Sequence, residues 1–302
     1  MACRAELPDL PERLVSYHLR PKRAEISRKS KLENLKSYLD GLVERFERPS
    51  FIDDDPISIP HGFDDPRDQE VIGLYAALLA WGRRDVMLRK LRELCERMGY
   101  APYAFVRDYG ERDAEALAGF KHRTFQPIDA RWFTKNLSRV LSEYGSVERV
   151  FAAHLPADAE TVGPAIQGFS ETIIAASSET PSRLRKHLAR PEAGSAAKRL
   201  SMYLRWMVRP GPVDLGLWSA IPKRKLALPL DVHSGRQARA LGLVERKTNS
   251  WRVVETLTRR CRRLCPDDPA RYDFAFFGAG AHDVTLDERF TGECAFDGST
   301  RR

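Results

Sequence analysis

The sequence predicts an all-α protein. Apolar residues recur at helical spacing in most segments, and the strict alternation of apolar and polar residues that marks a strand is scarce. The chain has 302 residues, which is enough to bury a large core, and its 42% hydrophobic and 30% charged residues are an ordinary globular mixture. No stretch approaches the ~20 apolar residues that cross a bilayer. We therefore expect no membrane partner.

The first predicted helices are read from periodicity and from capping residues. Residues 32–48 place five large apolar side chains at helical spacing: Leu32, Leu35, Leu39, Leu42 and Phe46. Residues 49–66 are rich in turn formers and are expected to form a loop. Asp65 and Pro66 then begin a helix over residues 67–81, because aspartate caps free N–H groups and proline needs no partner at the first position. This helix is apolar on most sides, so we expect it in the core.

The rest of the chain continues the helical pattern. Gly82 ends the core helix, and residues 84–98 form the next one. Further helices are predicted over residues 102–109, 114–119, 130–144, 161–176, 181–188, 196–208, 233–241, 251–264 and 269–277. The last stretch, residues 281–302, is polar and is expected to be a frayed tail.

Cysteine usage and charge bound the function. The five cysteines are odd in number and scattered, which argues against a disulfide framework. Cys261 and Cys265 lie one helical turn apart, but no second close pair completes a zinc or iron–sulfur site. We expect no metal and no cofactor. The net charge of +8 gives weak support to a nucleic-acid partner. The first residues lack the apolar core of a signal peptide, so we expect a cytoplasmic, nucleoid-associated location.

Lys198 is the first candidate for chemistry. Gly194 makes a turn that leads into its helix, and a buried stripe is predicted along Ala197, Leu200, Leu204 and Met207. Lys198, Arg205 and Arg209 fall on the other side, with Met202 between them. The first turn of a helix is already electropositive and therefore favours the neutral amine, the form that a nucleophile requires. The alternative from spacing alone is a surface lysine.

Asp231 is the second candidate. Pro229 precedes it, and the aspartate caps a helix that Gly242 ends. A carboxylate held by backbone N–H groups stays ionised and can stabilise positive charge on a sugar. The alternative is capping alone, although the two roles are compatible.

The two segments together resemble the helix-hairpin-helix DNA glycosylase superfamily. Its pattern is a hairpin that ends G-x-G-x-K, followed later by V-D-T-H or V-D-V-H. Residues 194–198 keep the first glycine and the lysine, and residues 230–233 read Leu-Asp-Val-His. The Lys198–Asp231 spacing is similar to that of the archaeal 8-oxoguanine glycosylases. Within the superfamily, the chain most resembles a little-characterised bacterial family.

Two further segments agree with the resemblance, and three features depart from it. Residues 78–86 resemble the superfamily's L-L-S-x-Q-x-x-D-V helix end, and residues 275–279 resemble the helix that carries a base-stacking phenylalanine. Ala196 replaces the second hairpin glycine, and Gly82 replaces the wedge glutamine, so that Arg83 or Arg84 would fill the gap left by an everted base. The four-cysteine iron–sulfur loop is absent.

The resemblance implies two helical lobes with a cleft between them. Residues 67–208 would form a barrel-like lobe that carries the hairpin, and residues 1–66 and 209–280 would form the second lobe. Its implied function is a monomeric base-excision glycosylase with AP lyase activity on duplex DNA that contains an oxidised purine such as 8-oxoguanine. Lys198 and Asp231 would be catalytic, Phe277 would line the base pocket, and the remaining DNA contacts would be Gly194, Ser195, Ala196, His233, Arg236 and Arg239.

Two alternatives stay open at this stage. One is a non-catalytic DNA-binding protein on the same scaffold, because a fold does not fix a function. The other is an unrelated helical enzyme or RNA-binding module, which predicts that Lys198 and Asp231 lie more than ~10 Å apart.

Overall fold

The computed structural model describes residues 23–292 and residue 296. Within these residues the chain is helical, and β-structure is limited to two isolated bridges, His122 with Phe125 and Pro210 with Leu215. The all-α prediction is confirmed for this part of the chain. The same residues contain no helix that is both long and apolar enough to cross a membrane.

The elements follow one another along the chain, and the longest connections between α-helices precede and follow α10. The α-helices are α1 Arg23–Phe46, α2 Ser58–His61, α3 Pro66–Leu78, α4 Arg84–Arg97, α5 Pro102–Arg107, α6 Glu111–Ala116, α7 Pro127–Tyr144, α8 Val147–Ala153, α9 Gly163–Ala175, α10 Lys198–Val208, α11 Val232–Ala240, α12 Trp251–Leu264 and α13 Tyr272–Ala281. Short 3₁₀ turns join several of them: η1 Pro49–Phe51, η2 Ser182–His187, η3 Pro191–Ala193, η4 Lys223–Lys225, η5 Pro269–Arg271 and η6 Glu288–Phe290.

The start of α3 agrees with its sequence signal, but the helix ends at Leu78, earlier than the predicted end at Gly82, and two short helices do not follow from sequence. Asp65 caps α3 by accepting a hydrogen bond from the backbone of Arg67. The predicted loop over residues 49–66 contains η1 and α2, whose Ile59 and Pro60 are buried. The helix α8 was not predicted at all. Both α2 and α8 are too short for periodicity to reveal, so that burial against neighbours decides them.

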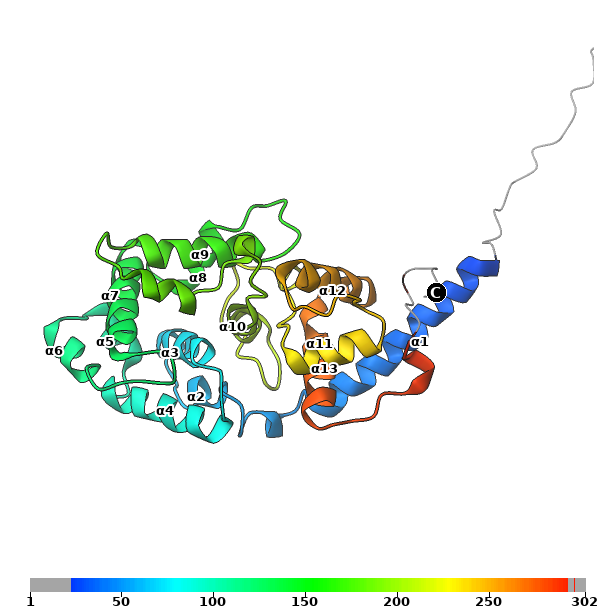
Figure 1. Cartoon of the computed structure of the whole chain (residues 1–302), viewed down its shortest axis with the longest axis horizontal. Helices are drawn as coiled ribbons and strands as arrows, with labels where there is room; N and C mark the ends of the chain where they lie inside the picture. The colour runs from blue at the N-terminus through cyan, green and yellow to red at the C-terminus, as the bar shows by residue number, and fades with distance from the viewer. Residues whose placement is uncertain (1–22, 293–295, 297–302) are drawn as a thin grey trace, which may run out of the picture.

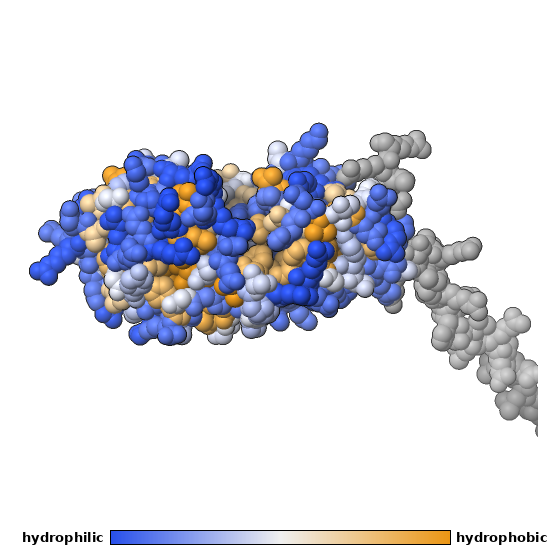
Figure 2. All heavy atoms as spheres, turned by 90° about the horizontal axis from the view of Figure 1, so that it is seen from below, coloured by the Kyte–Doolittle hydropathy of each residue, from blue (hydrophilic) through white to orange (hydrophobic). Residues whose placement is uncertain are grey.

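Figure 1 shows the helices in two groups. The helices α3 to α9 lie at one end of the molecule, and α1, α11, α12 and α13 lie at the other, with α10 between them. In the second group α13 packs against both α1 and α11, and α10 packs against α3 of the first. The face seen in Figure 2 is mostly hydrophilic, with apolar atoms gathered towards the middle of the molecule.

The central helix α10 is buried almost all round. The predicted apolar stripe is buried, but so are Met202, Arg205 and Arg209, which the sequence placed on an opposite polar side. Arg205 pairs with Asp214 and Asp273. Arg209 pairs with Asp214 and with two acids from elsewhere in the fold, Glu47 and Asp268. Because removal of one partner leaves a buried charge unpaired, such a network costs about 3–5 kcal/mol to break. It fixes α10 to both the chain that follows it and the second group of helices.

Part of the predicted C-terminal tail lies within the described residues. Phe290 stacks on Tyr38 of α1, with 4.7 Å between the ring centroids, and Val284 donates a backbone hydrogen bond to Ala279. The tail is therefore packed against the second group of helices up to Gly292. The rest of the predicted tail, residues 293–295 and 297–302, lies outside the described residues, as do residues 1–22 of the predicted N-terminal part.

Candidate functional site

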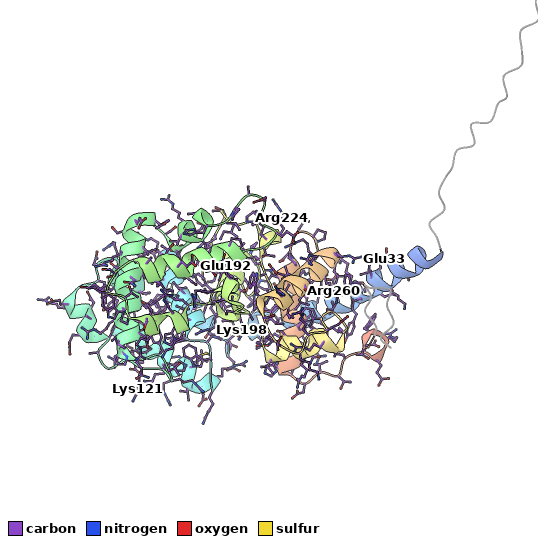
Figure 3. All side chains as sticks on the ribbon, turned by 45° about the horizontal axis from the view of Figure 1, so that its top comes forward. Glu33, Lys121, Glu192, Lys198, Arg224 and Arg260 are labelled. Carbon is purple, nitrogen blue, oxygen red and sulfur yellow. The ribbon has the colours of Figure 1, made fainter. Side chains whose placement is uncertain are left out.

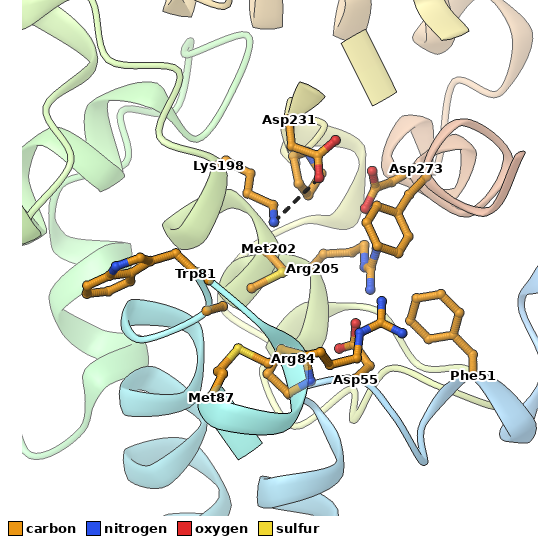
Figure 4. A pocket seen from close by; sticks show the side chains of 15 residues that line it. Phe51, Asp55, Trp81, Arg84, Met87, Lys198, Met202, Arg205, Asp231 and Asp273 are labelled. Carbon is orange, nitrogen blue, oxygen red and sulfur yellow. Dashed lines mark hydrogen bonds and ion pairs between the residues drawn. The ribbon is translucent and has the colours of Figure 1, made fainter. Parts of the chain in front are cut away.

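Lys198 and Asp231 meet near the middle of the molecule. The Nζ atom of Lys198 lies 3.6 Å from Oδ2 of Asp231, and the two side chains keep 30% and 17% of their surface exposed. Figure 3 places Lys198 between the two groups of helices, and Figure 4 shows its amine directed towards the carboxylate. Both groups are therefore partly desolvated while they remain open to a ligand.

The backbone ahead of Lys198 is bent by two left-handed residues. Gly194 has φ +83°, where glycine carries no steric penalty, and Ala197 has φ +49°, which an L-residue rarely adopts. Lys198 is then the first residue of α10, and no side chain caps that helix end. The first N–H groups of α10 thus lack an intrahelical partner. The turn presents both the lysine amine and an electropositive helix end to the same space.

Asp231 uses its two carboxylate oxygens differently. Its Oδ1 accepts a hydrogen bond of 2.8 Å from the backbone N–H of Ser234, so it caps α11 as the sequence predicts. Its Oδ2 faces Lys198. The side-chain amide of Asn249 donates to the backbone oxygen of Asp231 at 2.9 Å and fixes the same residue from another loop. Capping and contact with the amine coexist in one side chain.

A cavity of about 120 Å³ opens beside the pair. Engineered cavities of roughly 150 Å³ take up one benzene ring, so this one suits a single planar ring. Its walls combine three kinds of group: aromatic rings (Phe51, Trp81, Phe277), thioethers (Met87, Met202) and charged side chains (Asp55, Arg84, Lys198, Arg205, Asp231, Asp273). A planar, polar ring is the natural occupant of such a space.

Two acids that line this cavity were not predicted from the sequence. Asp273 precedes Phe277 by one helical turn on α13, and both residues line the cavity. Burial and, to a lesser extent, nearby Asp231 raise the pKa of Asp273 to about 6 despite its ion pair with Arg205. Burial likewise raises the pKa of Asp55, which lies just before α2. A single acid inside the apolar α13 segment was a usable signal for Asp273, whereas nothing in the turn-rich residues 49–66 distinguishes Asp55.

A wider basic groove adjoins the cavity. It has a volume of about 660 Å³ and shares Trp81, Arg84, Lys198, Asp231 and Phe277 with the cavity. Its cationic residues come from the chain before and within α10 and from α4: Arg84, Arg185, Lys186, Arg190, Lys198 and Arg199. Asp231 is the one acid among the residues that line it. The groove is thus suited to a polyanion.

Trp81 forms part of the wall between cavity and groove. It is half-buried and lines both spaces. The guanidinium of Arg199 lies 4.8 Å from the ring centroid of Trp81 and donates to the carbonyl of Leu78 at the end of α3. Burial lowers the pKa of Arg199 to about 10. Arg199 therefore holds Trp81 and the end of α3 in one arrangement.

The predicted hairpin contacts are only partly on the groove. Ser195 lines it, whereas Gly194 and Ala196, its neighbours in the turn, are not among the lining residues. His233 also lines the groove and lies edge-on to Phe277, with ring centroids 6.1 Å apart, and its Nδ1 is 3.1 Å from the carbonyl of Gly280. Ser195 and His233 therefore line the same groove as Lys198.

The predicted arginines divide into one that lines the site and three that do not. Arg84 lines both spaces, but Arg83 pairs with Asp85 in solvent. Arg236 donates to Gly280 and pairs with Asp283. Arg239 donates to the carbonyl of Arg246 and to the side chain of Asn249, so it supports the loop that holds Asp231. These three arginines already have protein partners.

Gly82 lies where the resemblance places a wedge side chain. It has φ +98°, and a Cβ atom there would approach the side chain of Arg123 to 2.8 Å. Arg123 sits in the turn between His122 and Phe125, and His122 holds that turn against Trp81 through a 2.9 Å contact with its carbonyl. Because glycine leaves the space free, the exposed Arg123 lies across the rim of the site.

The part of the chain that the structure describes contains no group of three or more His, Cys, Asp or Glu side chains placed to hold a metal ion. Cys261 is fully buried, and burial raises the pKa of its thiol.

Comparison with known proteins identifies a family but no characterised relative. No curated protein and no solved structure matches the chain significantly. A family model described as a protein of unknown function, DUF2400, matches residues 55–282, which include Asp55, Lys198, Asp231, Asp273 and Phe277. The match covers well over half of the chain, and the protein therefore belongs to the DUF2400 family.

Proposed function

We propose that this protein is a DNA base-excision glycosylase with AP lyase activity, and that Lys198 and Asp231 form its catalytic pair. The observation that carries the proposal is the 3.6 Å approach of the amine to the carboxylate at the boundary between a ring-sized cavity and a basic groove. Catalytic groups must share one reacting centre, and this separation is far inside the ~10 Å beyond which they do not.

The basic groove supports a nucleic-acid substrate. Lysine and arginine side chains that neutralise phosphates supply most of the affinity for a duplex, and the open N–H groups at the start of α10 favour a phosphate oxygen there. A base inside a duplex is out of reach, so the enzyme would evert the nucleotide into the cavity. Trp81 and Phe277, which line both spaces, lie on the path of such a base.

The proposed reaction balances with the residues present. The neutral amine of Lys198 attacks C1′ of the sugar, a bond forms between Nζ and C1′, and the bond from C1′ to the base nitrogen breaks. The base leaves with the electron pair. Asp231 takes the proton that the lysine nitrogen loses and passes it to the departing base, which leaves neutral. Opening of the sugar ring gives a Schiff base. Loss of a C2′ proton then expels the 3′ phosphate and nicks the strand.

Asp231 has a second task in this reaction. Positive charge develops at C1′ as the base departs, and a fixed carboxylate beside it lowers the energy of that state. The backbone N–H of Ser234 and the amide of Asn249 hold Asp231 in place. The enzyme therefore need not reorganise this group at the moment of reaction.

The finer features of the proposal follow the same family resemblance. The two groups of helices would be the two lobes, with the substrate between them, and the protein would act as a monomer on chromosomal DNA in the cytoplasm. The lesion would be an oxidised purine such as 8-oxoguanine. Because the cavity suits one ring, the second ring of a purine would need the adjoining groove or a shift of Met87 and Met202, whose unbranched side chains adapt readily.

Covalent trapping tests the proposal directly. The protein is incubated with duplexes that contain an abasic site or 8-oxoguanine, in the presence of borohydride, which reduces a Schiff base to a stable adduct. We expect a protein–DNA adduct with the wild type and none with Lys198→Ala. Lys223→Ala, which removes an exposed lysine outside the site, is the matched control and should trap as the wild type does.

Binding distinguishes the main alternative. A non-catalytic DNA-binding protein would bind the duplex with the same affinity after Lys198→Gln and would release no base from any lesion. The absence of an adduct on abasic DNA, together with the absence of base release across oxidised, deaminated and alkylated lesions, would overturn the enzymatic proposal.

A further inference from the structure

The cavity holds a second polar cluster, away from Lys198 and Asp231. Figure 4 shows Asp55 at the other end of the cavity from the catalytic pair, with Arg84 on the same side. Asp55 comes from the chain just before α2, and Arg84 is the first residue of α4. Neither residue belongs to the elements that supply the amine and the carboxylate.

Asp55 is a buried acid with an unused oxygen. Only 8% of its surface is exposed, and its Oδ1 accepts a hydrogen bond of 3.1 Å from the backbone of Ile57. Its Oδ2 has no hydrogen-bond partner among the described residues, although the side chain lines the cavity. This oxygen is not among the buried side-chain atoms that lack a partner, so it is open to the cavity that Asp55 lines. A ligand that brings an N–H group into the cavity would supply the partner that the described residues do not.

Arg84 offers the complementary function. Its guanidinium, which carries N–H donors only, makes no hydrogen bond or ion pair with the described residues, and its charge favours the ionised form of Asp55. The other arginine of the cavity, Arg205, is already engaged by Asp214 and Asp273. The far end of the cavity therefore presents one acceptor and one free set of donors.

The orientation of an everted nucleotide decides which edge of its base faces Asp55 and Arg84. The proposed reaction fixes C1′ at Lys198 and Asp231, so that the base extends from there into the cavity. The pairing edge of a base lies opposite its bond to the sugar. It would thus face Asp55 and Arg84, with Phe51 and Phe277 among the cavity walls.

We infer that Asp55 and Arg84 read the pairing edge of the everted base, Asp55 accepting a hydrogen bond from its N–H donor and Arg84 donating to the neighbouring acceptor. The inference rests on the proposed glycosylase function and deepens it. The substrate class is a base whose pairing edge is intact, such as an oxidised or deaminated base. Bases with a methyl or etheno group on that edge are excluded, because they leave the buried oxygen of Asp55 without a donor.

Matched pairs of lesions test the inference. Single-turnover release is measured on duplexes that contain 8-oxoguanine or its N1-methyl derivative, and uracil or its N3-methyl derivative. We expect the wild type to prefer the unmethylated member of at least one pair by roughly tenfold to 100-fold, since an unpaired buried polar group costs about 1–3 kcal/mol. Asp55→Ala should reduce this ratio towards one, because it removes the acceptor and leaves room for the methyl group.

The controls separate this inference from the function on which it rests. Asp54→Asn removes an exposed neighbouring acid and should keep the wild-type ratio. Borohydride trapping of the wild type on abasic DNA reports Lys198 chemistry without any base. The wild type could form the adduct on abasic DNA and yet release both members of each pair at equal rates, or release neither unmethylated base. Either result would overturn the reading of the edge and leave the lyase intact. Failure of trapping would overturn both.

The wild-type ratio keeps the test independent of variant folding. A circular-dichroism melt of Asp55→Ala shows whether the ratio is measured on folded protein. If Asp55→Ala is folded and retains the full wild-type ratio, another group reads the edge and the assignment to Asp55 is wrong.

Discussion

The hydroxyl group of Ser234 lies 3.3 Å from Oδ1 of Asp273, a buried carboxylate on a different helix. The backbone N–H of the same serine donates to Asp231. One residue at the start of α11 thus fixes the acid beside the lysine and contacts a second acid in the cavity. The other oxygen of Asp273 pairs with Arg205, two turns along α10 from Lys198. The site is therefore braced through contacts among three helices, α10, α11 and α13.

Asp273 should make stability depend on pH. Its pKa is raised from 3.8 to about 6 in the folded protein, mainly by burial. Between these two pH values the folded state binds more protons than the unfolded state. The contribution of this group to the free energy of unfolding is therefore complete below about pH 4 and is lost as the pH rises through 6. We expect the free energy of unfolding of the wild type to fall by roughly 2–3 kcal/mol relative to that of Asp273→Asn between pH 4 and 7.

Urea titrations of both proteins at several pH values measure this difference. Asp267→Asn, which changes an exposed acid outside the site, should show no comparable trend. A constant difference in the free energy of unfolding between wild type and Asp273→Asn across this range would contradict the assignment.

Two substitutions of Asp231 should separate its role as a helix cap from its role in catalysis. Asparagine caps a helix about as well as aspartate, so Asp231→Asn should change the free energy of unfolding by less than about 0.5 kcal/mol. Because it removes the charge beside C1′, it should slow base release by roughly 10²–10³-fold. Asp231→Ala should lose the cap as well, at about 1 kcal/mol. Urea titration and single-turnover release measure the two effects, and an Asp231→Asn protein with full activity would show that the carboxylate only caps α11.

Arg199 should stabilise the rim of the site. It lies over Trp81 and donates to the carbonyls of Leu78 and His187. Lysine lacks the planar fork that makes these contacts together, so Arg199→Lys should lower the free energy of unfolding by about 1–3 kcal/mol. Arg185→Lys, an exposed change in the same groove, is the control and should stay within about 0.5 kcal/mol. Equal urea midpoints for the two variants would contradict this role.

The cationic residues of the groove should contribute to the salt dependence of duplex binding. Arg185 and Lys186 line it and are exposed. If each neutralises one phosphate, changing both to alanine should reduce the slope of log affinity against log salt by about 2. Fluorescence anisotropy with an undamaged duplex measures the slope. Arg112→Ala on α6, which Figure 1 places at the far end of the molecule, should leave it unchanged. The groove does not bind the duplex if both variants keep the wild-type slope.

The sequence by itself determined the local features of this protein. The helical period of α3 and α10, the cap at Asp65 and the position of Lys198 directly after a left-handed turn all depend on residues within about four positions of each other. The same is true of Asp231 as the cap of α11. Such features are visible in one stretch of chain, because the hydrogen bonds and side-chain contacts that make them are local.

Only the tertiary structure decided what surrounds the amine. Asp55, Arg84 and Asp273 come from three separate elements, and packing between those elements puts them around one cavity. The sequence placed Arg205 on the side of its helix away from the apolar stripe, and the resemblance implied a DNA contact for Arg239. In the structure Arg205 is buried between two acids and Arg239 holds a loop. The environment of a charge, and therefore its pKa and its partners, is set by residues far away in the chain that fold against it, and no helical pattern carries that information.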